Sequence, residues 1–219
     1  MITFDNVSKQ YDAGFEALQE VSFNVCAGEL VFLTGHSGAG KSTVLKLIML
    51  MERASSGSVQ VNTKKLSQMG VNDIPCHRQQ IGVVFQNHQL LFDRSVFDNI
   101  ALPLRICGYA PQDATRRVRA ALDKVGLLNR EKMNPMQLST GEQQRIGIAR
   151  AIVHKPKILL ADEPTGNLDP QLSAEVMTLF KQFNQIGTTV LIASHDLSLI
   201  RRMNCRTLTL KEGRLIDDV

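Results

Sequence analysis

The sequence predicts an α/β fold in which a mixed sheet is flanked by helices. Four short apolar runs are continuous rather than alternating in polarity, which is typical of strands buried on both faces of a sheet. These runs are residues 30–33, 83–85, 158–161 and 190–193. Segments with the spacing of amphipathic helices lie between them, and this alternation predicts a sheet covered on both faces.

The N-terminal strands differ from these four in their pattern. Residues 2–4 and 21–25 alternate between apolar and polar side chains, as strands of a half-exposed antiparallel sheet do. The sequence therefore predicts an N-terminal antiparallel β subdomain in addition to the buried sheet.

A third part of the chain, from about residue 89 to 151, carries no strong strand pattern. Five of its apolar residues fall on one face of a helix that ends before Gly126: Ala114, Val118, Ala121, Leu122 and Val125. We interpret this part as a helical lobe inserted into a single domain that spans residues 1–219.

Residues 35–43 read GHSGAGKST and follow the first buried run. They fit the phosphate-binding pattern G-x-x-x-x-G-K-[ST], in which glycines let backbone N–H groups turn toward an anion at the positive end of a helix. Lys41 would reach the β- and γ-phosphates of a nucleotide, and the Ser42 hydroxyl would bind Mg²⁺. The alternative, a glycine-rich turn without a ligand, is disfavoured by the strand before the loop and the apolar helix after it. The predicted phosphate contacts are Gly35, His36, Ser37, Gly38, Ala39, Gly40, Lys41, Ser42 and Thr43.

The third apolar run leads directly into two carboxylates, Asp162 and Glu163. A parallel strand places such residues at the carboxyl edge of the sheet, beside the phosphate loop. Asp162 could hold Mg²⁺ through water there, and Glu163 could orient and polarise the water that attacks the γ-phosphate. Taken alone, the segment could be a strand that ends in acidic surface residues, but the phosphate loop favours the catalytic interpretation.

Residues 138–145 read LSTGEQQR and precede a helical segment. Here the sequence resembles the ATP-binding cassette family, whose signature motif reads LSGGQ or LSGGE. The phosphate loop, this motif, the strand ending at Glu163, the turn at 166–169 and residues 194–196 follow the family's order over essentially the whole chain. The resemblance implies a P-loop NTPase fold, Mg²⁺-dependent ATP hydrolysis, and two copies that dimerise head to tail over ATP.

The resemblance also implies roles for residues outside the phosphate loop. Within one copy these are Tyr11 stacking on adenine, Gln86 near Mg²⁺ and the attacking water, and His195 at the γ-phosphate. Between copies, Ser139 and Gly141 would bind the ATP of the partner, and Asp169 would help to link the two sites. From the residues alone, ordinary structural roles stay open as well: Tyr11 as a surface aromatic, Gln86 as a polar strand end and His195 as a sheet-edge histidine.

Two positions depart from the family pattern. Thr140 stands where the family usually has glycine, and its β-branched side chain disfavours positive φ. We expect Thr140 to be tolerated, in an extended conformation or as a helix N-cap, although Ser139 with Glu142 forms a competing capping box. Relatives often carry glycine where Leu50 stands, so the sequence does not determine the conformation of the turn there, but the chemistry of the site is not affected.

The composition is that of a folded protein with an ordinary surface. It has 43% hydrophobic residues, and 25 Lys and Arg against 21 Asp and Glu give a net charge of +4. This charge fits an anionic neighbour or simple surface charge equally well. The four cysteines lack the spacing of a zinc site, so we expect reduced thiols. Without an aromatic-rich basic groove, no nucleic-acid partner is expected.

The expected partner is an integral membrane protein. Residues 90–101 look like those of the cell-division branch of the family, whose members work with a membrane protein of FtsX type in cell division and in the control of peptidoglycan hydrolases. The sequence predicts neither a signal peptide nor a membrane span. We therefore expect a peripheral ATPase at the cytoplasmic side of the inner (plasma) membrane. The alternatives are an ATPase of lipoprotein release or export, and a cassette protein that works on nucleic acid.

Overall fold

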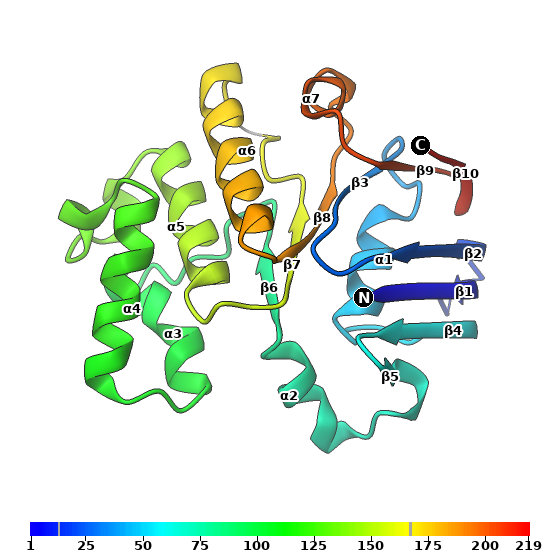
Figure 1. The fold of residues 1–219 in the computed structure, drawn as a ribbon, viewed down its shortest axis with the longest axis horizontal. Helices are drawn as coiled ribbons and strands as arrows, with labels where there is room; N and C mark the ends of the chain where they lie inside the picture. Colours follow the sequence, from blue (N-terminus) through cyan, green and yellow to red (C-terminus); the bar gives the residue numbers. More distant parts are fainter. Residues whose placement is uncertain (13, 167) are drawn as a thin grey trace.

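The computed structural model describes residues 1–12, 14–166 and 168–219, and this part of the chain forms two sheets (Figure 1). Six strands make the central sheet in the order β10-β9-β3-β8-β7-β6, and four make a second sheet in the order β2-β1-β4-β5. The P-loop NTPase type of mixed sheet that the sequence predicts, with its antiparallel subdomain and helical lobe, is confirmed.

The predicted apolar runs form the parallel core of the central sheet. They are β3 (Leu30–Thr34), β8 (Thr189–Ala193), β7 (Ile158–Asp162) and β6 (Ile81–Val84), so that the second predicted run overshoots its strand by one residue, Phe85. In the register, Ala193 of β8 lies between Leu33 and Asp162. The carboxyl ends of these strands are therefore aligned along one edge of the sheet. Strands β9 (Thr207–Lys211), parallel to β3, and β10 (Arg214–Asp218), antiparallel to β9, complete the mixed sheet.

The second sheet is antiparallel, as the alternating N-terminal pattern predicts. Its strands are β1 (Ile2–Gln10), β2 (Glu16–Val25), β4 (Ser56–Val61) and the short β5 (Lys64–Lys65). Phe4 and Phe23 stack across β1 and β2 with ring centroids 4.6 Å apart. The alternate side chains of β2 are buried, which gives this sheet one apolar face.

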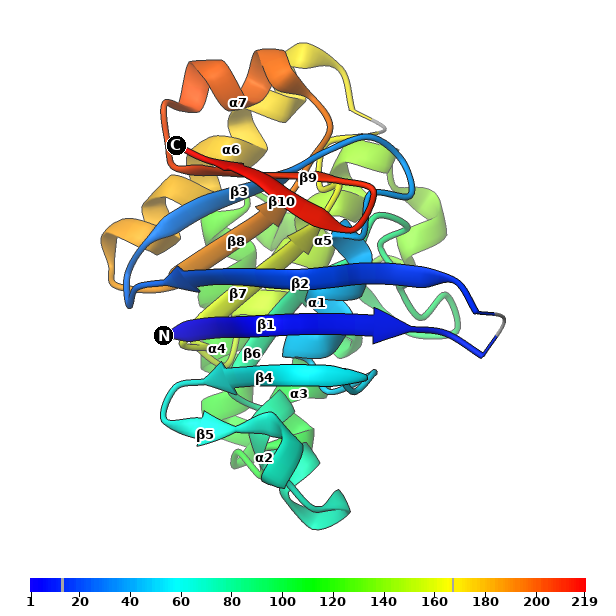
Figure 2. The same ribbon diagram turned by 90° about the vertical axis from the view of Figure 1, so that its right-hand side faces the viewer.

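Helix α1 (Lys41–Ile48) lies between the two sheets (Figures 1 and 2). Its buried apolar residues belong to one cluster with Ile2 and Phe4 of the second sheet and Val31 and Leu33 of the central sheet. The opposite face of the central sheet is covered by α6 (Pro170–Gln185) and α7 (Leu197–Met203). Since α1 is packed on both sides, its position relative to the strand ends is fixed.

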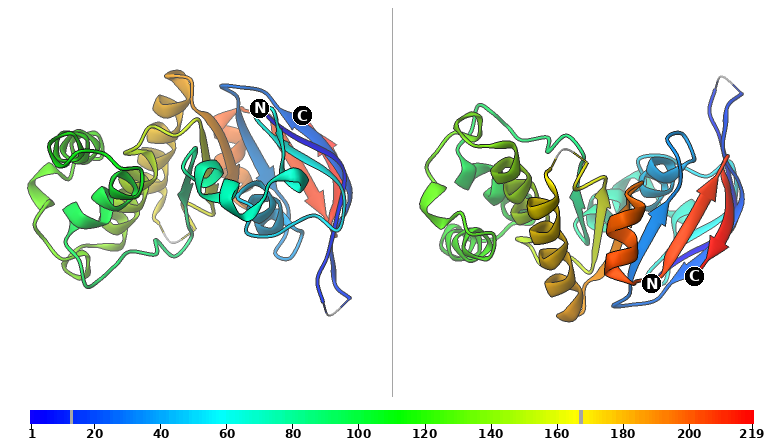
Figure 3. Two further views of the ribbon diagram at one scale, coloured as in Figure 1. Left: turned by 90° about the horizontal axis from the view of Figure 1, so that it is seen from below. Right: turned by 90° about the horizontal axis from the view of Figure 1, so that it is seen from above.

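The segment from Leu90 to Val153 forms a helical lobe with its own apolar cluster (Figure 3). It contains α3 (Val96–Ile106), α4 (Pro111–Lys124), α5 (Thr140–Ile152) and two 3-10 turns, η3 (Leu128–Arg130) and η4 (Pro135–Gln137). The predicted apolar face of α4 is buried in this cluster, and Gly126 follows the helix with φ 70°. Only α5 of this lobe also contributes to the cluster under α6 and α7, through Ile148 and Ala151.

The carboxyl end of α1 is closed by side chains of a neighbouring helix. After two 3-10 turns, η1 (Leu66–Gln68) and η2 (Val71–Asp73), the short helix α2 (Ile74–Arg78) lies beside this end. His77 Nε2 is 2.7 Å from the Ile48 carbonyl oxygen, and Arg78 donates to the carbonyls of Met49 and Leu50 at 3.1 and 2.9 Å. Leu50 has φ 53°, in the left-handed region that glycine favours. The hydrogen bonds from α2 therefore stabilise the departure from glycine at this position.

Because of this arrangement, the stability of the fold should depend on pH through His77. Burial lowers the pKa of this ring below 6.5, so the folded chain binds a proton less readily than the unfolded chain. We expect the free energy of unfolding to fall as the pH drops from about 7.5 to about 5, where histidine becomes charged in the unfolded state. His77→Gln keeps an N–H donor but does not titrate, so its fall should be smaller in urea unfolding. Burial also lowers the pKa values of His88 and His154, which contribute to the pH dependence of both the wild type and the variant. A free energy of unfolding that falls equally in the two proteins would therefore contradict a role for His77.

Candidate active site

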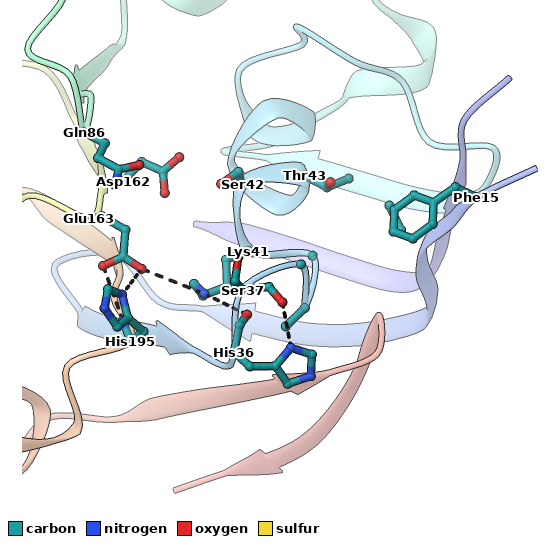
Figure 4. Close-up of a pocket in the computed structure, with 14 residues that line it drawn as sticks. Phe15, His36, Ser37, Lys41, Ser42, Thr43, Gln86, Asp162, Glu163 and His195 are labelled. Carbon is teal, nitrogen blue, oxygen red and sulfur yellow. Dashed lines mark hydrogen bonds and ion pairs between the residues drawn. The ribbon is translucent and has the colours of Figure 1, made fainter. Parts of the chain in front are cut away.

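A cavity of about 450 Å³ opens at the aligned carboxyl ends of the strands (Figure 4). The phosphate loop follows β3, Gln86 follows β6, Asp162 ends β7, and His195 follows β8. Parallel strands bring these separate segments to one edge. The cavity is lined by Phe15, Ala17, residues 36–43, Gln86, Asp162, Glu163 and His195. The structure thus brings together most of the residues that the sequence singles out.

The floor of the cavity is the start of α1. Gly40 is the N-cap with φ 105°, so no side chain caps this helix. A Cβ at Gly40 would lie 2.6 Å from the Ala17 carbonyl oxygen and 2.7 Å from Leu18 Cδ2, which excludes other residues here. The first N–H groups of a helix have no acceptor within the helix. An uncapped start at a cavity is therefore a binding site for an anion such as phosphate.

Lys41 supplies a positive charge at this helix start. Its ammonium group donates to the carbonyls of Gly35 at 2.7 Å and His36 at 3.1 Å, and it lies 3.8 Å from Glu163 Oε1. The residue is only 8% exposed. Gly35 does not line the cavity, but its carbonyl helps to hold the ammonium group in place. The loop thus presents both N–H groups and a fixed cation to a ligand.

Asp162, Ser42 and Gln86 form an oxygen-rich corner of the cavity (Figure 4). Burial raises the pKa of Asp162, and the nearby Glu163 raises it further, while a hydrogen bond with Ser42 lowers it. No group of three or more His, Cys, Asp or Glu residues that could hold a metal ion occurs within the described ranges. A carboxylate, a hydroxyl and an amide suit a hard cation such as Mg²⁺, which keeps several other ligands.

Glu163 is held with its carboxylate in the cavity. Its Oε1 lies 2.8 Å from His195 Nδ1, and the His195 backbone N–H donates to Oε2 at 3.4 Å. Glu163 has φ 47°, a left-handed conformation, and its N–H donates to the Ala193 carbonyl at 2.9 Å. Strained backbone of this kind persists where its surroundings fix it, often at functional sites. The side chain is 11% exposed, so the carboxylate reaches the cavity but little bulk solvent.

The structure places Phe15, rather than Tyr11, on the cavity. Both aromatics belong to the turn between β1 and β2, where the Tyr11 N–H donates to the Phe15 carbonyl at 3.0 Å. Phe15 is 58% exposed at the cavity, whereas the Tyr11 ring lies under the Lys9 ammonium group at 4.9 Å. Phe15 was not among the residues predicted for the site, since an exposed aromatic in a turn belongs to no motif. A second aromatic four residues from Tyr11 was the available signal.

The signature segment does not line this cavity. Ser139 is the N-cap of α5 and forms a capping box with Glu142, whose carboxylate accepts from the Ser139 N–H at 2.9 Å. Thr140 is the first helical residue, so it is neither extended nor the N-cap, and of the two caps that the sequence left open the capping box of Ser139 and Glu142 is the one that forms. The reciprocal bonds of Ser139 and Glu142 win the competition for the cap. A Cβ at Gly141 would lie 2.8 Å from Leu172 Cδ1, so this glycine lets α5 approach α6.

The turn after β7 is described only in part. Asn167 lies outside the described residues. Asp169 caps α6, accepting from the N–H groups of Gln171 at 2.9 Å and Leu172 at 3.0 Å. Asp169 therefore has a structural task in one copy of the chain, besides the link between copies that the resemblance implies.

The chain is similar to known ATP-binding proteins over its whole length. A family profile described as ABC transporter matches residues 18–166. Cell division ATP-binding protein FtsE of Escherichia coli (strain K12) is 55% identical over 215 residues, which are 98% of this chain and 97% of that protein. The protein of the same name from Bacillus subtilis (strain 168) is 42% identical over 218 residues, covering 100% of this chain and 96% of its own. The recognition of the family and of its cell-division branch is confirmed.

Solved structures show the same fold. The dimeric structure of MJ0796, a bacterial ABC transporter cassette, has a TM-score of 0.92 and 34% sequence identity, covering 100% of this chain and 98% of that chain. A second structure of MJ0796, a dimeric post-hydrolysis state bound to ADP and Pi, has a TM-score of 0.92 and 33% identity, with the same coverage.

The raised pKa of Asp162 leads to a prediction about stability. A buried carboxylate beside Glu163 destabilises the folded state once the pH exceeds the pKa of the unfolded chain, 3.8. Asp162→Asn keeps the shape without the charge, so at neutral pH and without nucleotide its melting temperature should be higher than that of the wild type. Asp93→Asn, at a carboxylate side chain that is 79% exposed, is the control and should melt like the wild type. An unchanged or lower melting temperature for Asp162→Asn would contradict the argument.

Proposed function

The chain belongs to the ABC transporter family of ATPases, and on this premise we propose that it couples ATP binding and hydrolysis to conformational change in an integral membrane partner during cell division. The observation that carries the ATPase chemistry is the Glu163 carboxylate, held by His195 and 3.8 Å from Lys41 at an uncapped helix start. Whole-length identity of 42–55% to cell-division ATPases carries the biological role.

Phosphate binding and charge neutralisation are the tasks of the loop. The helix start and Lys41 would hold the β- and γ-phosphates, because N–H groups and an ammonium group stabilise the negative charge that phosphoryl transfer spreads over its oxygens. We place Mg²⁺ at Ser42, Asp162 and Gln86, since these are oxygen ligands at the same cavity. When bound, Mg²⁺ would neutralise phosphate charge. It would also favour the ionised form of Asp162, whose pKa burial otherwise raises.

Water activation is the task of Glu163 and His195. The Glu163 carboxylate would accept a hydrogen bond from the attacking water and orient it toward the γ-phosphate. His195 Nδ1, at 2.8 Å, fixes the rotation of this carboxylate. Its side chain is 65% exposed, so the other ring edge can reach a phosphate oxygen. Gln86 lies beside Asp162 in the cavity and would complete the polar wall around the attacking water (Figure 4).

A second copy of the chain would complete the site. Ser139 and Gly141 do not line the cavity of their own copy, which fits contacts to the ATP of the partner. The dimeric MJ0796 structures, with 33–34% identity over the whole chain, support this arrangement. Adenine would stack on the turn between β1 and β2, where Phe15 lines the cavity and Tyr11 is hydrogen-bonded to it through the backbone.

The membrane partner would dock on the lobe, beside the segment that follows Gln86. Phe92, in the segment that follows Gln86, is 48% exposed, and Met136 of η4 is 72% exposed. Asn134, the N-cap of η4, donates to the Phe92 carbonyl at 2.7 Å and so holds these two segments together. We propose a partner of FtsX type, which would act on peptidoglycan hydrolases and hold this chain at the cytoplasmic side of the inner membrane. None of the helices among the described residues has the length and apolar character that a membrane span needs.

Replacing two residues of the cavity should separate binding from hydrolysis. Glu163→Gln should bind ATP but hydrolyse it about 100-fold more slowly, the scale for losing a positioned base. Lys41→Ala should bind ATP about 10- to 100-fold more weakly, as expected when a charge-assisted hydrogen bond is removed. Equilibrium binding of a fluorescent ATP analogue and release of phosphate measure the two steps. Near-normal turnover in Glu163→Gln would remove this residue from its role.

If the partner docks at this surface, a substitution there should weaken the association of the membrane protein with this chain without lowering the basal ATPase activity. Phe92→Asp should reduce by at least about tenfold the membrane protein recovered with the tagged chain from detergent-solubilised membranes, because a charge in an apolar contact costs about 2 kcal/mol or more. Ile106→Asp, at a 64% exposed residue at the opposite end of α3, is the matched control and should not reduce recovery. Recovery of a lipoprotein exporter instead of an FtsX-type protein would contradict the proposed partner.

A further inference from the structure

Helix α5 is tied to both backbone segments that flank the cavity. From one end of the helix, Arg150 donates to the carbonyls of His88 at 2.6 Å and Gln89 at 2.7 Å. From the other end, Gln144 donates to the carbonyl of Pro164 at 2.7 Å. His88 is two residues beyond Gln86, and Pro164 directly follows Glu163. One helix therefore fixes the backbone next to Gln86, at the oxygen-rich corner of the cavity, and the backbone next to Glu163.

The segment that Arg150 holds is strained. His88 and Gln89 have φ of 49° and 46°, two consecutive left-handed residues, neither of which is glycine. Such conformations persist only where surrounding groups determine them. The Arg150 guanidinium donates to the carbonyls of these same two residues, and charge-assisted hydrogen bonds are the strong ones.

The partners of Arg150 distinguish it from an ordinary surface arginine. Its guanidinium has no carboxylate within 4.0 Å among the residues that the structure describes. The residue is half-buried, and this burial lowers the pKa of its guanidinium. Gln144 is only 2% exposed, so its amide donates to the Pro164 carbonyl away from bulk water.

We propose that Arg150 and Gln144 are positioning residues: Arg150 sets the place of Gln86 through the backbone of His88 and Gln89, and Gln144 sets that of Glu163 through Pro164. The proposal rests on the ATPase function proposed above. Ser139 caps the start of the same helix. A second copy that contacts this start and displaces α5 would therefore move the segment at His88 and Gln89 together with the segment at Pro164. Hydrolysis would then respond to the position of one helix.

The test compares Arg150→Ala with two matched variants. Arg150→Ala should lower kcat by about 10- to 100-fold, the scale for misplacing a catalytic group by ~1 Å, with KM for ATP changed by less than about threefold. Arg150→Lys keeps a cation that can donate to a carbonyl and should recover part of the loss. Arg145→Ala removes an arginine from the same helix whose partner is Glu175 at 3.2 Å, and its kcat should stay within about twofold of the wild type.

A double-mutant cycle decides whether Arg150 acts through Gln86. In a Gln86→Ala background, Arg150→Ala should lower kcat further by less than about threefold, because the residue it positions is already absent. Independent, multiplicative losses would overturn the proposal, as would an equal loss in Arg145→Ala. If Arg150→Ala does not fold, the same cycle is run with Arg150→Lys, and multiplicative losses there overturn the proposal too.

Hydrogen exchange separates this proposal from the proposed function. Arg150→Ala should increase amide exchange in residues 86–90, whereas Arg145→Ala should leave it unchanged. If the wild-type chain has no ATPase activity, that result would contradict the proposed function and, with it, the positioning role in catalysis. Exchange at residues 86–90 that Arg150→Ala leaves unaltered, in a chain that does hydrolyse ATP, would overturn the positioning role alone.

Discussion

The uncapped start of α1 is the constraint on which the rest of the structure depends. Gly40 leaves the first N–H groups of the helix without a side-chain acceptor, and a single anion can accept hydrogen bonds from several of them at once. Packing between two sheets prevents α1 from shifting, and the register of β3, β8 and β7 places the carboxylates opposite it. The sheets thus fix a cation, a row of N–H groups and two carboxylates around one cavity.

Stability and function oppose each other around this cavity. Burial makes ionisation of Asp162 unfavourable, and Glu163, His88 and Gln89 occupy left-handed conformations that other residues must hold. The Lys41 ammonium group, 3.8 Å from Glu163, offsets part of the negative charge. A triphosphate would add more negative charge beside both carboxylates, and a bound divalent cation would offset part of that charge. The strained and uncompensated groups are those that a nucleotide and its metal would stabilise.

Residues that belong to a spaced pattern could be predicted from the sequence, and residues defined by packing could not. Continuous apolar runs revealed the buried strands, and the end of one of them led to Asp162 and Glu163, whereas the role of His195 came from the resemblance to the family. Strand β5 consists of Lys64–Lys65 and exists only through its pairing with β4, so its residues give no signal. Phe15 reaches the cavity through the shape of a turn, and Arg150 acts on backbone carbonyls, which leave no trace in side-chain spacing. For Thr140, the sequence left two caps open and the Glu142 hydrogen bonds decided between them.

Calorimetric titration of the wild-type chain with ATP, in the presence and absence of Mg²⁺, tests the central claim most directly. The account predicts saturable binding of one ATP per chain that weakens when Mg²⁺ is removed, because the helix start, Lys41 and Asp162 share one ligand. A folded chain that shows no saturable heat with ATP and Mg²⁺ would contradict it.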